Sequence, residues 1–139
     1  MNGADSDKPD SYPLPAIECS FVAEGTANPI REKSFRFALA MIGVCRSLQS
    51  DREFVISKQL MRSGTSIGAN VEEAISAESR KDFLHKMNLA LKEARESHYW
   101  LRLLDASEIE VIGGLHQHLM AGDELIRLLV SITRSLSRS

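Results

Sequence analysis

The segment Gly64-Thr65-Ser66-Ile67-Gly68 has the Gly-x-Ser-x-Gly spacing of the nucleophile elbow in serine hydrolases. In that motif a strand precedes the serine, a helix follows it, and a sheet lies beneath, so that the hydroxyl can attack an acyl group. Asp105 with His116 or His118 would supply the rest of a catalytic triad. The surrounding sequence has neither a strand pattern nor a recognisable oxyanion loop. We therefore expect no catalytic residue, and a small serine hydrolase is the least favoured hypothesis.

The histidines and cysteines do not have the spacing of a metal or cofactor site. His116 and His118 are two residues apart, which turns them about 200° from each other on a helix. Cys19 and Cys45 form no Cys-x-x-Cys pair, and the sequence contains no His-Glu-x-x-His motif. We therefore predict no metal ion and no cofactor.

A set of basic side chains has the spacing to meet phosphates. They repeat at heptad intervals, about 200° from the apolar positions of the same segment, and we call them the basic stripe: Lys81, His85, Asn88, Lys92, Arg95, Tyr99 and Arg102. The tyrosine among these bases could stack on an unpaired nucleotide. The alternative is an ordinary solvated face, neutralised by Asp82–Lys86 and Lys92–Glu96 pairs with Glu93 alongside. From the residues alone, the solvated face is the favoured interpretation.

Length and composition indicate one ordinary domain. The chain has 139 residues, a formal net charge of −2 and 43% hydrophobic residues. It has no long apolar run and no basic signal segment, so we expect neither membrane insertion nor secretion, and a cytoplasmic location. All four prolines lie in the first 29 residues. Residues 1–28 also have five acids and one base, which predicts a flexible acidic leader of net charge −4 before a bundle domain at 29–139.

Start signals predict four helices over residues 29–49, 51–77, 80–104 and 108–136. Asn28 before Pro29 indicates the first start. The other three starts have the form of a capping box, in which an acid follows a serine by three residues; the pairs are Ser50–Glu53, Ser79–Asp82 and Ser107–Glu110. Short connections make successive helices antiparallel, so the predicted fold class is all-α, an up-down-up-down four-helix bundle.

Apolar residues in the predicted helices recur at steps of three and four, as a bundle core requires. The predicted core positions are Ala38, Met41, Cys45 and Leu48, then Ile56, Leu60, Ser63, Ile67, Val71 and Ala74, then Phe83, Met87, Ala90, Ala94, Ser97, Leu101 and Leu104, then Leu115, His118, Gly122, Leu125, Leu129, Ile132 and Leu136. Leu89, Trp100 and Leu103 lie beside this core on one flank of the third helix and predict a contact in a homo-oligomer. The alternative is a wide core that covers Trp100.

Two glycines four residues apart interrupt the second predicted helix. Each costs about 1 kcal/mol relative to alanine inside a helix. We expect another helix to approach closely along Gly64 and Gly68, with Asn70 hydrogen-bonding across the interface to fix its register. The alternative is that the helix breaks at this point.

Several runs of sequence resemble the bacterial four helix bundle proteins, also called the 23S rRNA-intervening sequence protein family. The runs are Lys33–Ala38, Lys58–Ala74, Ala90–Ala94 and Tyr99–Leu101. The resemblance is specific over residues 31–104 and extends to the last helix only by pattern. It implies an antiparallel four-helix bundle, often assembled into a ring-like homopentamer, with no established catalytic activity.

The family also suggests a partner. Its members are encoded within inserts in large-subunit ribosomal RNA genes, and related accessory variability determinant proteins of diversity-generating retroelements form basic barrels that bind RNA and a reverse transcriptase. The resemblance therefore implies a non-enzymatic oligomeric scaffold associated with RNA or single-stranded nucleic acid, with a reverse transcriptase as a further candidate partner. This chain differs from those barrels in its sequence pI of about 6.1 and its acidic leader. The alternative is a purely structural or protein-interaction bundle.

One cluster in the second helix matches the family pattern. We interpret it as a helix-packing motif and not as a binding site: Arg62, Ser63, Gly64, Ser66, Gly68, Asn70 and Glu73.

Overall fold

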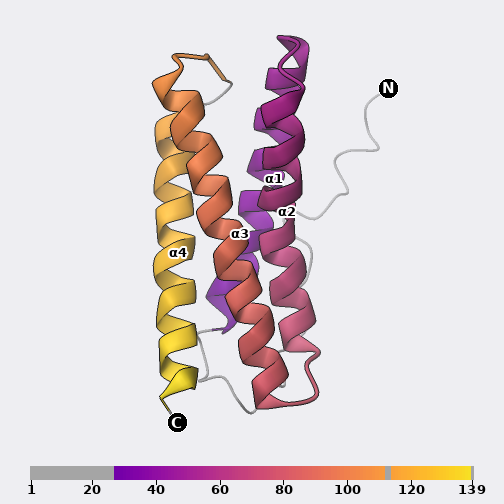
Figure 1. Ribbon diagram of the computed structural model, residues 1–139, viewed down its shortest axis with the longest axis vertical. Coiled ribbons are helices and arrows are strands. Elements are labelled where there is room, and N and C mark those ends of the chain that lie inside the picture. Colours follow the sequence, from indigo (N-terminus) through magenta and orange to yellow (C-terminus); the bar gives the residue numbers. More distant parts are fainter. Residues whose placement is uncertain (1–26, 112–113, 139) are drawn as a thin grey trace, which may run out of the picture.

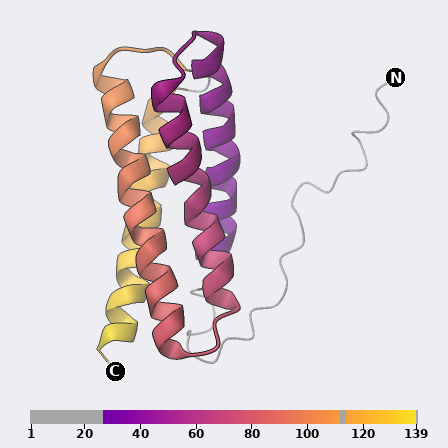
Figure 2. The same cartoon turned by 45° about the vertical axis from the view of Figure 1, so that its right-hand side comes forward.

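The described part of the chain consists of four long helices and their connections (Figure 1). The computed structural model describes residues 27–111 and 114–138. The helices are α1 (Ala27–Ser50), α2 (Val55–Ile75), α3 (Arg80–Ala106) and α4 (Leu115–Ser137). Successive helices run in opposite directions along one long axis, and the described part of the chain contains no strand (Figure 2). The predicted all-α, up-down-up-down bundle is confirmed, whereas the predicted leader at 1–28 lies almost entirely outside the described residues.

The helices pack in the order of the sequence. α2 contacts α1 and α3, α3 contacts α4, and α1 closes the bundle against α4 through a smaller contact. The two diagonal pairs, α1 with α3 and α2 with α4, make no close backbone approach. α3 therefore has a neighbour on each side and one free outer face.

The core follows the predicted positions most closely in α3. All seven residues predicted there are buried. In α2 the predicted positions from Leu60 to Ala74 are buried, and Ile56 is partly exposed but packs against the core. In α4, His118 is only partly buried. In α1, Met41, Cys45 and Leu48 are buried as predicted, but Ala38 is only partly buried. The prediction for α1 also missed Ile30, Phe37 and Val44, which are buried.

One predicted helix start agrees with the structure, and another is shifted by two residues. Ser79 is the N-cap of α3, and its hydroxyl oxygen accepts the Asp82 backbone N–H at 3.0 Å. α1 begins at Ala27, two residues before the predicted start, so Asn28 lies inside the helix and is not its N-cap, and Pro29 lies in the first turn. A proline costs little there because the first N–H groups of a helix have no intrahelical partner.

The predicted cap at Ser50 is wrong. Ser50 belongs to α1, and its hydroxyl donates to a carbonyl oxygen of its own helix at 3.1 Å. The chain turns through Arg52, whose φ of 63° is left-handed. α2 starts later, where the Glu53 carboxylate accepts the N–H groups of Val55 and Ile56 at 3.1 and 2.9 Å. A carboxylate suits this place because the helix dipole favours negative charge at the N-terminus.

The predicted cap at Ser107 is also wrong. Ser107 is the C-cap of α3, and its hydroxyl donates to the Leu104 carbonyl oxygen at 2.8 Å. Glu108 then adopts a left-handed φ of 63°, which ends the helical path. α4 begins only at Leu115, after the N-cap Gly114 with φ 75°. The start of the fourth helix therefore lies seven residues beyond the predicted position 108.

Candidate nucleic-acid interface

The helix that carries the glycines is continuous, so the alternative of a break in α2 is wrong. A β-carbon on Gly64 would lie 2.7 Å from Cγ and 2.9 Å from Cβ of Met41 in α1. A β-carbon on Gly68 would be 3.5 Å from its nearest neighbour, in Ser34. A side chain at Gly64 would therefore overlap the Met41 side chain, while one at Gly68 would make an ordinary van der Waals contact with Ser34.

Asn70 does not bridge two helices as predicted. Its side-chain amide donates to the Ser66 carbonyl oxygen of its own helix at 2.9 Å. A buried polar contact between α2 and α3 is made instead by two serines, since the Ser97 hydroxyl donates to Ser63 Oγ at 2.9 Å. A paired polar contact inside an apolar core favours one register of the two helices.

Arg62 of α2 binds two carboxylates of α3. Its Nη1 lies 3.0 Å from Glu93 Oε2, and its Nη2 donates to Glu96. The Trp100 indole N–H also donates to Glu96, at 3.1 Å. Partial burial raises the pKa of Glu96, but the hydrogen bonds from Trp100 and Arg62, together with the Arg62 charge, outweigh it and hold that pKa below its ordinary value. Both carboxylates are thereby held on the side of α3 that faces α2.

The ion pairs expected to neutralise the basic stripe do not form. Lys86 pairs with Glu73 of α2 at 2.8 Å and not with Asp82. Glu96 is held by α2 and makes no ion pair with Lys92. Glu93 and Glu96 thus serve the α2–α3 contact.

The stripe itself is exposed along its full length, which is the outer face of α3. Within the described ranges, no carboxylate pairs with any of its four permanent cations, Lys81, Lys92, Arg95 and Arg102. At its upper end in Figure 1 the Arg102 guanidinium lies 5.7 Å from the centre of the Tyr99 ring, which is 46% exposed. An arginine and an exposed ring at this distance provide a surface on which a base can stack.

The three residues of the predicted oligomer contact differ in their exposure. Trp100 and Leu89 are half-buried, and Trp100 packs against the core, in keeping with the wide-core alternative. Leu103 is 38% exposed. Two further exposed apolar residues lie at the same end of the bundle, in and after the α1–α2 connection: Phe54 at 59% and Val55 at 74%. We call Phe54, Val55 and Leu103 the apolar end patch. Sequence analysis missed Phe54 and Val55 because it placed them inside a helix.

The structure does not bring the hypothetical triad together. Ser66 lies in the middle of α2, and its hydroxyl donates to the Arg62 carbonyl oxygen at 2.6 Å. His116 and His118 lie in the first turn of α4, a helix that does not approach α2. Asp105 is in the last turn of α3. Residues 27–65, which precede the serine, contain no strand, so the local geometry of a nucleophile elbow does not arise.

No metal-binding cluster or membrane span occurs in residues 27–111 and 114–138. Histidine, cysteine and carboxylate side chains form no group of three suited to a metal ion, and no helix is long and apolar enough to cross a bilayer. Cys45 is a buried thiol that donates to the Ser57 carbonyl oxygen at 3.3 Å. Burial raises its pKa to about 11, which keeps the thiol neutral.

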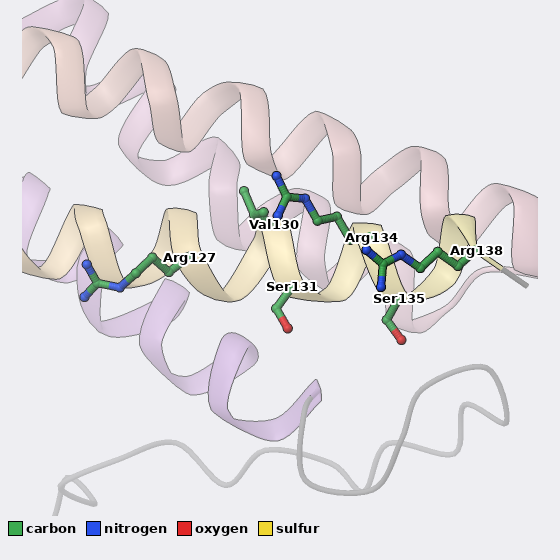
Figure 3. A pocket seen from close by; sticks show the side chains of 6 residues that line it. All are labelled: Arg127, Val130, Ser131, Arg134, Ser135 and Arg138. Carbon is green, nitrogen blue, oxygen red and sulfur yellow. The ribbon is translucent and has the colours of Figure 1, made fainter.

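Two further features were not predicted from the sequence. Arg31, whose side chain is 6% exposed, forms two hydrogen bonds of 2.6 Å with the Glu72 carboxylate and ties the start of α1 to the end of α2. On the outside of α4, Arg127, Arg134 and Arg138 line a shallow open groove (Figure 3). The sequence signal for this groove is the absence of any acid after Glu124.

The comparisons with known proteins agree on one family. The sequence profile of the 23S rRNA-intervening sequence proteins matches residues 27–131. A crystal structure from Bacteroides thetaiotaomicron VPI-5482, described as a protein of unknown function from the S23 ribosomal protein family, is similar to this chain, with a TM-score of 0.74 and 43% sequence identity. The similarity covers 78% of this chain and 98% of that one. No curated protein matches the chain significantly.

Proposed function

The chain belongs to the 23S rRNA-intervening sequence protein family, and we propose that it is a non-enzymatic, oligomeric scaffold that binds RNA or single-stranded nucleic acid. The proposed binding surface is the basic stripe of α3. We place the scaffold in the cytoplasm, where a free thiol such as Cys45 stays reduced.

The unpaired state of the stripe is the observation that carries this proposal. A chain with a net charge of −2 is not attracted to nucleic acid as a whole, so binding needs a local excess of positive charge. Arg62 makes this local excess of positive charge possible, because it holds Glu93 and Glu96 on the side of α3 that faces α2. Exposed lysines and arginines without carboxylate partners are free to replace the counterions of phosphates.

The upper end of the stripe adds a contact that does not depend on charge. Tyr99 presents an exposed ring flanked by Arg102, and every base has a face that can stack on such a ring. Stacking tolerates any sequence. The proposed binding is therefore weak in each subunit and has little sequence preference.

Oligomerisation would strengthen this binding. We propose a homo-oligomer, with the pentamer of the family as the expected form and the apolar end patch among its contacts. Each added subunit repeats the stripe, and a nucleic acid that spans several subunits gains affinity without any new kind of contact.

The second candidate is a protein-interaction bundle without nucleic-acid binding. The apolar end patch favours it, because Phe54, Val55 and Leu103 are exposed large hydrophobic residues at one end of the molecule. Such patches often mark protein contacts. In this case the stripe would be a solvated surface.

Fluorescence anisotropy with a labelled RNA strand of about 16 nucleotides separates the two candidates. The parent should bind, with an affinity that falls between about 50 and 200 mM salt, and Lys92→Glu with Arg95→Glu should abolish most of the binding. Arg46→Glu with Lys58→Glu is the matched control, since it makes the same charge change at exposed positions of α1 and α2. A parent oligomer that does not bind RNA or single-stranded DNA at low salt would leave the protein-interaction bundle as the better account.

A further inference from the structure

The outer face of α4 carries a second set of cations. Arg127, Arg134 and Arg138, which we call the α4 row, project from one side of the helix, with Ser131 and Ser135 between them (Figure 3). Positions at i, i+7 and i+11 share a face and here cover about 16 Å of helix. All three arginines are exposed, and no carboxylate in the described part of the chain forms an ion pair with them.

Two contacts set the relative height of α3 and α4. At one end the Arg80 guanidinium donates to the Leu136 carbonyl oxygen at 3.1 Å. Further along, His98 Nε2 lies 3.0 Å from Asp123 Oδ1. Residue numbers rise along α3 as they fall along α4, because the two helices are antiparallel neighbours.

The α4 row is therefore level with the lower half of the basic stripe. Arg138 lies near the height of Lys81, and Arg127 lies near the height of Lys92. The two sets of cations cover the same stretch of the bundle, on adjacent helices.

Both sets lie on the outer surface of the α3–α4 pair. Lys81 and Lys92 lie 17 and 6 residues before His98, which places them about 100° and 120° around α3 from the side that contacts α4. Arg127 lies four residues after Asp123, on the side of α4 nearest α3. The carboxylate between the helices, Asp123, is engaged by His98.

We infer that the lower half of the basic stripe and the α4 row form one face that binds double-stranded RNA, each row along one of its two phosphate backbones. The inference rests on the proposed function and names its ligand. Axes of packed helices lie roughly 8–10 Å apart, so the face presents two separate lines of cations and not one. Two lines suit a ligand with two strands.

The side chains of this face suit a duplex better than a single strand. Between Lys81 and Lys92, and between Arg127 and Arg138, the described residues include no exposed Phe, Tyr or Trp, and the imidazole of His85 is the one exposed ring there. Single strands are bound partly by stacking on larger rings such as that of Tyr99, which lies outside this stretch. A-form RNA hides its bases and is recognised through phosphates and 2′-hydroxyls. The exposed hydroxyls of Ser131 and Ser135 can donate to or accept from a 2′-hydroxyl beside the arginines.

The test compares a blunt RNA duplex of about 16 base pairs with one of its single strands, both with the full-length protein. The variant is Arg134→Gln with Arg138→Gln. Duplex affinity should fall about tenfold, and the salt dependence of log Kd should lose about two units of slope, one for each phosphate contact. Affinity for the single strand should change less than about threefold, because stacking at Tyr99 is untouched. Circular dichroism confirms that the variant folds.

Arg46→Gln with Lys58→Gln removes the same charge from α1 and α2 and should leave both affinities near the parent values. An unchanged duplex affinity in the α4 variant would overturn the inference. If Lys92→Glu with Arg95→Glu still weakened RNA binding in that case, the proposed function would stand. The inference would also be overturned if the α4 variant lost equal affinity for duplex and single strand, or if the control variant lost as much duplex affinity as the α4 variant. A parent that binds no RNA at all would overturn both proposals.

Discussion

Met41 Cγ lies 2.7 Å from the position that a β-carbon on Gly64 would occupy. Met41 Cβ is almost as close, at 2.9 Å, and it cannot move without the backbone of α1. The approach of α1 and α2 therefore depends on the missing side chain at position 64. Gly68, one turn further along α2, is not under the same constraint, because its nearest neighbour would be at 3.5 Å.

Gly64→Ala and Gly68→Ala should change stability in opposite directions. Alanine improves helix propensity by about 1 kcal/mol at either position. At Gly64 the clash with Met41 should outweigh this gain, for a net loss of roughly 1–3 kcal/mol. At Gly68 the gain should remain. Urea unfolding monitored by circular dichroism measures both changes, and a Gly64→Ala protein more stable than the parent would refute the close packing at this point.

Arg62→Gln should weaken RNA binding although Arg62 is not part of the basic stripe. The substitution releases Glu93 and Glu96, which can then pair with stripe residues such as Lys92. We expect a Kd increase of a few-fold at low salt, measured by anisotropy. Lys58→Gln, one turn earlier on the same helix, removes the same charge and is the control. If the two variants bound equally, the carboxylates would have no part in the effect.

Stability should fall in acid partly through Glu96. Its pKa is held below the ordinary value of 4.5, so its charged form stabilises the fold above that pH, and this contribution disappears as the pH falls through the folded pKa. The free energy of unfolding of Glu96→Gln should therefore decrease less than that of the parent between about pH 5 and pH 3. Parallel urea titrations at several pH values measure the difference. Identical pH dependence in both proteins would mean that the Arg62–Glu96 contact adds nothing in solution.

Tyr99→Ala should weaken the binding of single-stranded RNA without changing its salt dependence. Loss of one stacked base corresponds to roughly 1.4 kcal/mol, or about tenfold in Kd. The slope of log Kd against log salt should stay the same, because stacking releases no counterions. Tyr99→Phe keeps the ring and should bind like the parent. A changed slope, or a weak Tyr99→Phe variant, would contradict a stacking role.

Light scattering should give a mass several times the subunit mass of 15.4 kDa, with five subunits expected from the family. Leu103→Asp with Val55→Asp should reduce that mass, since both residues belong to the apolar end patch. Leu39→Asp is the control because Leu39 is 54% exposed on α1, away from the patch. A parent that remains at 15.4 kDa at all concentrations would remove the oligomer from the proposal.

The periodicity of the sequence was sufficient to predict the fold, because each helix buries one face along its whole length. The starts after α1 and α3 were less predictable, because a serine followed by an acid is a local pattern that also occurs where a helix ends. At Ser50 and Ser107 the chain leaves the helix through left-handed residues, Arg52 and Glu108, that are not glycine. Nothing in their residue type marks such a turn.

The position of the basic stripe was predictable from the sequence, but its lack of ion-pair partners was not. Its place follows from the spacing of its residues along α3. Its lack of partners depends on Arg62, which lies 31 and 34 residues away in sequence from Glu93 and Glu96. Whether Glu93 and Glu96 pair with Arg62 or with a residue of their own helix depends on how α2 and α3 pack. The spacing of residues within a single helix cannot predict this.

The small contact between α1 and α4 has a consequence for how the chain folds. Every other helix contact joins neighbours in sequence, and only this one links the first helix to the last. The bundle can thus assemble as consecutive helical hairpins, a route of low contact order that is typical of folding in microseconds to milliseconds. Forming the α1–α4 contact closes the longest loop of the bundle, and this contact is the smallest of the four between helices. We therefore expect its opening to need less free energy than the separation of any other helix pair.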